Sequence, residues 1–274
     1  MSYIAACIQT TSGDDMEANI AHVTPLMEEA VAKGAKFIAL PENTFYMRRE
    51  GTAGAGIYTT AKHPGVRWVR KFAAKHQVWV LIGSIRAQKR GNDKPMNQSV
   101  LVGPEGVAVV YDKLHLFDVT LPDGTSYTES SQAGYGNVPV LARTPFGSIG
   151  LSICYDLRFP HLYRELALAG AEIIVVPSAF TRPTGEAHWH ALLRARAIEN
   201  GAFVIAPGQC GEHPGGRTTY GHSLIIDPWG SVLAEAGDEP CVLTATIDLA
   251  KVSAVRAQLP VLQHHRKMKK VKIV

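Results

Sequence analysis

Three residues of complementary chemistry come directly after three short apolar runs of the chain: Glu42, Lys113 and Cys154. The pattern predicts that these runs are core strands, at 37–40, 107–111 and 149–153. Sites of α/β folds are assembled at the ends of such strands. Because the three residues lie far apart in the sequence, only neighbouring strands of the folded protein would bring them together.

A carboxylate, an ammonium group and a thiol fit attack on an acyl carbon. The thiolate is the effective nucleophile, so Cys154 needs a base to take its proton and a positive charge to lower its pKa. Glu42 can be that base and Lys113 that charge. Cys154 also precedes a helical segment, where the amide of Tyr155 can bind the oxyanion of a tetrahedral intermediate. The alternative from these positions alone is a buried cysteine beside solvated ionic groups.

The elements that must position these residues alternate along the whole chain, and no linker divides it. This order predicts one α/β domain over 1–274. The first expected helix begins near Asp14, and Pro25 should kink it or mark its true start. The other expected helices cover 66–76, 159–169 and 186–200. A polar stretch at 116–137 predicts a long functional loop. The expected strands are 3–10, 36–41, 78–86, 97–102, 107–111, 147–153, 172–176, 202–206, 222–227, 232–235 and 242–247.

Composition excludes several classes of protein. Of 274 residues, 46% are hydrophobic and 19% charged, which are globular values. No apolar run approaches the roughly 18 residues of a membrane span. The net charge is +4, but five basic residues lie in a short tail at 266–274, leaving 23 basic and 24 acidic residues elsewhere. We therefore expect no nucleic-acid groove, no membrane insertion and a solvated tail.

The four cysteines lie far apart and form no C-x-x-C pair. This spacing is typical of free thiols in a reducing compartment, and the first residues show no basic, cleavable leader, so we expect a cytoplasmic protein. Two histidine pairs raise the question of a metal, His188 with His190 and His264 with His265. Positions i and i+2 of a helix face different ways, which is poor ligand geometry, so no metal site is expected.

The segments around the three candidate residues resemble the nitrilase superfamily of carbon–nitrogen hydrolases. The similarity extends over essentially the whole chain and lies in motifs that occur in the same order. Each of the first three motifs contains one of the candidate residues Glu42, Lys113 and Cys154. The matching segments are 40–43 (LPEN), 111–118 (YDKLHLFD), 152–160 (SICYDLRFP), 177–180 (PSAF), 184–189 (TGEAHW), 193–199 (LRARAIE), 220–223 (YGHS) and 227–230 (DPWG).

This resemblance implies an α-β-β-α sandwich and a catalytic set of Glu42, Lys113 and Cys154. It adds Glu129 as a second glutamate that holds the substrate amide and Lys113. Lys113 and the Tyr155 amide would stabilise the oxyanion, while Glu42 passes the thiol proton to the leaving nitrogen. The resemblance implies no metal or organic cofactor, a small-molecule amide as substrate, and a homodimer or higher homo-oligomer.

Within the superfamily the chain most resembles the Nit-type amidases, and among these the deaminated glutathione amidases more than the ω-amidases. Their substrates carry carboxylates, so a guanidinium should face the pocket, and we expect Arg158 to supply it. The resemblance places Phe180 and Thr184 at the substrate. Arg182 could recognise a larger peptide-like substrate or be a plain surface arginine. Hydrolysis of N-carbamoyl amino acids and a catalytically silent binding or scaffold protein stay open as alternatives.

Overall fold

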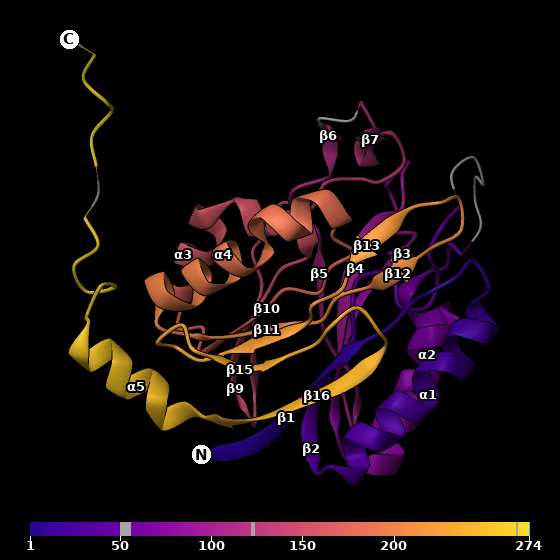
Figure 1. The fold of residues 1–274 in the computed structure, drawn as a ribbon, viewed down its shortest axis with the longest axis horizontal. Helices are drawn as coiled ribbons and strands as arrows, with labels where there is room; N and C mark the ends of the chain where they lie inside the picture. The colour runs from indigo at the N-terminus through magenta and orange to yellow at the C-terminus, as the bar shows by residue number, and fades with distance from the viewer. Residues whose placement is uncertain (50–55, 122–123, 267, 274) are drawn as a thin grey trace.

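Two six-stranded sheets stacked face to face form the centre of the molecule (Figure 1). The computed structural model describes residues 1–49, 56–121, 124–266 and 268–273. The first sheet has the order β16-β1-β2-β3-β4-β5 and the second β15-β14-β11-β10-β9-β8. The first comprises β1 (Ser2–Gln9), β2 (Ala35–Ala39), β3 (Trp79–Ala87), β4 (Met96–Gly103), β5 (Gly106–Asp112) and β16 (Cys241–Asp248). The second comprises β8 (Leu141–Thr144), β9 (Gly147–Leu151), β10 (Ile173–Val175), β11 (Phe203–Ala206), β14 (Leu224–Ile226) and β15 (Val232–Glu235).

Helices cover the outer face of each sheet. On the first sheet lie α1 (Met16–Ala32) and α2 (Pro64–His76), and on the second α3 (Pro160–Leu168) and α4 (Arg182–Asn200). A further helix, α5 (Leu249–Gln258), follows the last strand. The expected α-β-β-α sandwich is therefore confirmed.

Strand β1 shows why this sequence forms a buried middle layer. Ala5 and Cys7 join the core between the two sheets, while Ala6 and Ile8 join the core beneath α1 and α2. Because successive side chains of a strand point to opposite faces, only a strand that is apolar at every position can be buried on both. All four residues are fully buried.

The sequence predicted most elements to within a few residues, with three differences. Helix α1 begins at Met16, where the side chain of Asp15 caps it, so Pro25 lies inside the helix and does not mark its start. The expected loop 116–137 contains a small hairpin of β6 (Asp118–Thr120) and β7 (Ser126–Thr128). The remaining elements were not predicted: β8, α5, the hairpin of β12 (Cys210–Glu212) and β13 (Thr218–Tyr220), and the short 3₁₀ helices η1 (Thr60–Lys62) and η2 (Glu129–Ser131).

The C-terminal residues leave the body of the fold after α5 (Figure 1). In the basic tail, residues 268–273 are exposed, whereas 267 and 274 lie outside the described residues. Among the helices that the structure describes, none is long and apolar enough to cross a membrane.

Candidate active site

The ends of three strands bring the predicted residues together between the two sheets. Glu42 follows β2, Lys113 follows β5 and Cys154 follows β9, and all three side chains line one cavity of about 570 Å³. The Lys113 ammonium lies 3.0 Å from Glu42 Oε1 and 2.9 Å from Glu129 Oε2. Glu42 also lies beside the Cys154 thiol and acts on its pKa. The structure thus unites the four residues that the sequence singled out.

Both carboxylates are held by groups outside this quartet. The side-chain amide of Asn97 donates to Glu42 Oε1 at 3.0 Å and to Glu129 Oε1 at 2.9 Å. Backbone amides complete the set, since Ala179 donates to Glu42 Oε2 at 2.9 Å and Phe117 to Glu129 Oε2 at 2.7 Å. Hydrogen bonds of this kind favour the ionised carboxylate. Asn97 was not predicted, because a polar residue inside a buried strand carries no positional signal of its own.

Mutual attraction decides the charge of Glu42 and Lys113. Burial alone would raise the pKa of Glu42, yet Lys113 and the hydrogen bonds hold that pKa below its usual value. Burial alone would lower the pKa of Lys113, yet Glu129 and Glu42 raise it well above its usual value. At neutral pH the pair is therefore a carboxylate and an ammonium ion.

Cys154 rests as a thiol. Burial, and then the negative charge of Glu42, raise its pKa far above the ordinary value, and Lys113 offsets only part of this. Lys113 favours the thiolate, as predicted from the sequence, but burial and the charge of Glu42 outweigh its effect on the pKa. Formation of the nucleophile therefore depends on proton transfer to a nearby base, and Glu42 is the carboxylate that acts on the thiol.

A strained turn presents the Cys154 side chain to the cavity. Its φ is +49°, a left-handed conformation that is uncommon for residues with a side chain. The Cys154 amide donates to Pro177 O at 2.9 Å, and a short 3₁₀ helix, Cys154–Arg158, follows at once. Tyr155 is the second residue of this helix and lines the cavity. Its amide as oxyanion donor stays a prediction.

Asp156 ties this turn to the segment that carries Lys113. Its fully buried carboxylate accepts from the Tyr111 hydroxyl at 2.7 Å, the His115 amide at 3.0 Å and the Ile153 amide at 2.9 Å. Tyr111 and His115 lie two residues before and after Lys113. Asp156 is thus a positioning residue that the sequence argument missed. Its place two residues after the nucleophile, at a strand-to-helix turn, was the available signal.

Two glycines allow backbone to approach the site closely. A Cβ at Gly83 of β3 would overlap the carbonyl oxygens of Leu40 and Pro41, just before Glu42. A Cβ at Gly136 would overlap the backbone of Asp112, just before Lys113. Only glycine leaves room at such contacts.

The predicted substrate-binding residues divide into two groups. Phe180 and Thr184 line the cavity, but Arg158 and Arg182 are not among its described lining residues. Arg158 lies against the ring of Phe180, with its guanidinium carbon 5.4 Å from the ring centroid. Arg182, the first residue of α4, pairs with Asp238 at 3.0 Å. Neither arginine is among the described residues that line the cavity, although Arg158 packs behind Phe180, and their contact with substrate stays a prediction.

The geometry agrees with what comparison with known proteins finds. A family model described as carbon-nitrogen hydrolase matches residues 4–257. This chain belongs to the carbon–nitrogen hydrolase family. Among curated relatives of this hydrolase, the deaminated glutathione amidase of Synechocystis sp. is 42% identical over 266 residues, covering 96% of this chain and 97% of that protein.

Solved structures place the hydrolase in the nitrilase superfamily. The crystal structure of the C. elegans NitFhit protein aligns with a TM-score of 0.89 at 35% identity, covering 97% of this chain and 65% of that longer chain. The structure of Saccharomyces cerevisiae Nit3, a member of branch 10 of the nitrilase superfamily, gives 0.84 at 27% identity and covers 95% of each chain. The resemblance seen in the sequence is confirmed, and the protein is an amidase, a hydrolase acting on amides.

Three arginines that were not predicted line the cavity of this carbon–nitrogen hydrolase: Arg48, Arg86 and Arg217. Arg86 lies in β3, whereas Arg217 lies between β12 and β13. Arg86 Nη1 and Arg217 Nε are buried and have no hydrogen-bond partner in the described structure. Burial, and then the charge of Arg48, lower the pKa of Arg86. Scattered along the sequence, these residues form no motif, which is why the sequence argument passed over them.

Proposed function

We propose that this amidase hydrolyses a linear amide with more than one carboxylate, through a thioester on Cys154, and that deaminated glutathione is its substrate. The observation that supports this class of substrate is the set of arginines that line the cavity. Lys113 faces two carboxylates, Glu42 and Glu129. Three arginines, Arg48, Arg86 and Arg217, line the same cavity, so its described lining holds four cationic side chains against two carboxylates, a surplus that suits an anionic substrate.

The name of the Synechocystis relative supports the choice within that class. Deaminated glutathione carries a carboxylate on each side of its scissile amide, one on the ketoacid half and one on the terminal glycine. Cationic groups on separate elements, Arg86 in β3 and Arg217 between β12 and β13, suit such a molecule better than one with a single charged end. α-Ketoglutaramate, the ω-amidase substrate, has only one carboxylate.

In the proposed mechanism, Glu42 takes the thiol proton as Cys154 Sγ bonds to the amide carbon. The oxyanion forms beside the Lys113 ammonium and the Tyr155 amide, and removing one such donor typically costs about 10²–10³ in rate. Glu42 then gives its proton to the nitrogen, so the C–N bond breaks and a neutral amine leaves. Water, deprotonated by Glu42, then attacks the thioester carbon, the C–S bond breaks, and Glu42 returns the proton to the Cys154 sulfur as the acid is released. Glu129 orients Lys113 and the substrate amide.

We infer that residues 1–274 act as one catalytic domain, in the cytoplasm, as a homodimer. Four free cysteines, three of them buried, support a reducing compartment. Large apolar side chains exposed at Ile198 and Trp229 support self-association. Light scattering at several protein concentrations measures the assembly, and a monomer throughout would contradict it.

The substrate proposal is tested by comparing kcat/KM for deaminated glutathione and α-ketoglutaramate, measuring cysteinylglycine and ammonia release. We expect at least a tenfold preference for deaminated glutathione. Arg86→Ala and Arg217→Ala should each lower kcat/KM for the larger substrate by at least tenfold, because each removes a charged hydrogen-bond donor worth roughly 1.5–3 kcal/mol. Arg182→Ala is the matched control and should leave kcat/KM unchanged.

Three results would overturn this assignment. Preference for α-ketoglutaramate would make the protein an ω-amidase. Hydrolysis of N-carbamoyl amino acids alone would be consistent with the thioester mechanism but would contradict the proposed substrate. Loss of activity in Arg182→Ala, with Arg86→Ala and Arg217→Ala unaffected, would move substrate recognition away from the cavity wall.

A further inference from the structure

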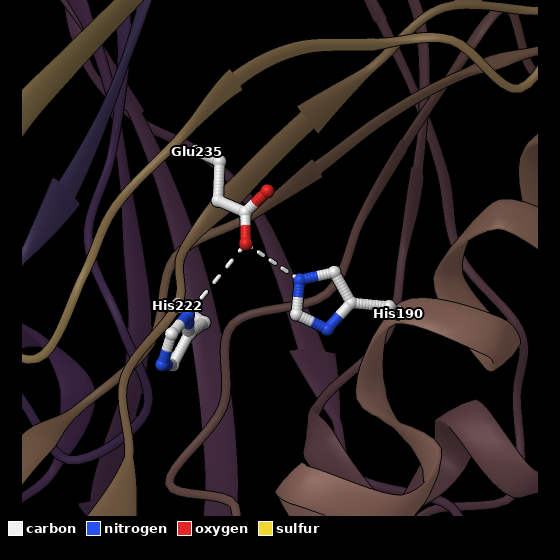
Figure 2. Close-up of side chains that lie close together, drawn as sticks. All are labelled: His190, His222 and Glu235. Atoms are coloured by element: carbon white, nitrogen blue, oxygen red, sulfur yellow. Dashed lines mark hydrogen bonds and ion pairs between the residues drawn. The ribbon is translucent and has the colours of Figure 1, made fainter.

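Outside the cavity, three potential metal ligands converge from three elements (Figure 2). His190 lies on α4, His222 follows β13 and Glu235 ends β15. Glu235 Oε1 lies 2.7 Å from His190 Nε2 and 3.6 Å from His222 Nδ1. One ligand atom from each residue lies within 4.8 Å of the other two. None of the three is among the described residues that line the active-site cavity.

The ring of His222 is held as a ligand would be. Its Nδ1 atom is buried and has no hydrogen-bond partner in the described structure, although it faces Glu235. Its other nitrogen, Nε2, lies 3.8 Å from Asp238 Oδ1, and Arg182 fixes that carboxylate at 3.0 Å. A carboxylate that accepts from the distal nitrogen is the usual support for a metal-bound histidine, and Asp238 stands just beyond hydrogen-bond distance of that nitrogen.

Aromatic packing fixes the rings further. Tyr220 stacks on His222 with centroids 4.2 Å apart, and the ring of His190 meets Tyr220 edge-on at 6.2 Å. The indole of Trp189 donates to the His222 carbonyl at 2.7 Å, which holds the backbone at that point. Packing of the rings and of the backbone therefore holds both imidazoles in place, independently of any contact that their nitrogen atoms make.

We propose that His190, His222 and Glu235 form a site for a divalent transition metal of the zinc type, with water as fourth ligand. Two imidazoles and one carboxylate suit Zn²⁺, with bonds of about 2.0–2.2 Å. Tetrahedral ligand atoms at that range lie about 3.3 Å apart. The 3.6 Å contact already fits, and the 2.7 Å contact opens by about 0.6 Å when a metal replaces the shared proton.

This site differs from the histidine pairs considered in the sequence. His188 turns away from His190 and contacts Arg158 at 3.3 Å, so the i and i+2 pair does not bind one ion. His190 instead meets residues 32 and 45 positions later. A bound ion would join α4 to the segment after β13 and to β15. Thr184, in the first turn of α4, lines the active-site cavity, so the metal would stabilise one wall of it.

Binding is tested with Zn²⁺ by calorimetry and with Co²⁺ by absorption, on the full chain freed of metal by a chelator. We expect one equivalent bound, with Co²⁺ giving the visible bands of a four-coordinate site and no sulfur charge-transfer band. His190→Gln, His222→Asn and Glu235→Gln should each weaken binding at least tenfold, while His188→Gln, the matched control on the same helix, should not.

A second measurement guards against variants that merely unfold. Zn²⁺ should raise the melting temperature of the wild type and of His188→Gln, and leave that of Glu235→Gln unchanged, because a ligand stabilises only a fold that binds it. The proposal is overturned by the absence of saturable binding, by equal affinity in the cluster variants, or by a sulfur band that places the ion on a cysteine.

Discussion

The charges around Cys154 are unequal, and this imbalance sets the chemistry of the resting enzyme. Two carboxylates, Glu42 and Glu129, face one ammonium group, Lys113. Burial, and then the negative charge of Glu42, keep the pKa of the thiol high, and Lys113 offsets only part of this. The residues are therefore arranged so that Glu42 deprotonates Cys154 as it attacks the substrate, and Cys154 is not a thiolate in the resting enzyme.

Glu42→Gln separates these two roles of the glutamate. Amide hydrolysis should fall by about 10²–10⁴ because the base is lost. The pH profile for alkylation of Cys154 by iodoacetamide should shift to lower pH, because the charge that raises the thiol pKa is removed while Lys113 stays. Rates of both reactions across pH measure this.

Glu129→Gln is the matched control for that experiment, since it removes a carboxylate from Lys113 without removing the base. It should lower hydrolysis less than Glu42→Gln does. An alkylation profile of Glu42→Gln that moves to higher pH would show that Glu42 does not raise the pKa of the thiol.

Among the elements, β3 fixes the position of Glu42. Gly83 packs against the backbone of Leu40 and Pro41, and the neighbouring Ser84 hydroxyl accepts from the Asn43 amide at 3.0 Å. The strand thus holds both sides of Glu42. It does so through backbone contact, which leaves no room for a side chain at residue 83.

Gly83→Ala should therefore lower both stability and activity. Overpacking of a buried contact typically costs about 1–3 kcal/mol, and the strain would move Glu42 from Lys113. Urea unfolding and kcat measure the two effects. Gly237→Ala is the matched control, because a Cβ there meets nothing within 4 Å, and it should change neither. Equal unfolding free energies for the two variants would refute the close packing at Gly83.

The whole molecule places its active site between the two sheets. Glu42 and Lys113 belong to the first sheet and Cys154 to the second, so a chain of packed strands determines the distance from base to nucleophile. The site is complete only when the sandwich is closed. This explains why the reactive residues lie far apart in sequence, at strand ends.

The sequence was informative where function depends on local motifs and silent where it depends on packing. Glu42 and Cys154 follow apolar strands, so their positions could be predicted. Arg86 and Arg217 reach the cavity from separate elements, and no spacing rule relates them. Helix α5 was missed because its buried stripe is only Val252 and Val255, too narrow for a clear helical period.

The mass of the enzyme during turnover tests most directly whether Cys154 carries a thioester. Protein mixed with the amide that it hydrolyses fastest is quenched in acid, digested and analysed by mass spectrometry. We expect the acyl half of the substrate on the peptide containing Cys154, and no hydrolysis by Cys154→Ala. An acyl group on another residue, or hydrolysis by Cys154→Ala at the wild-type rate, would contradict it.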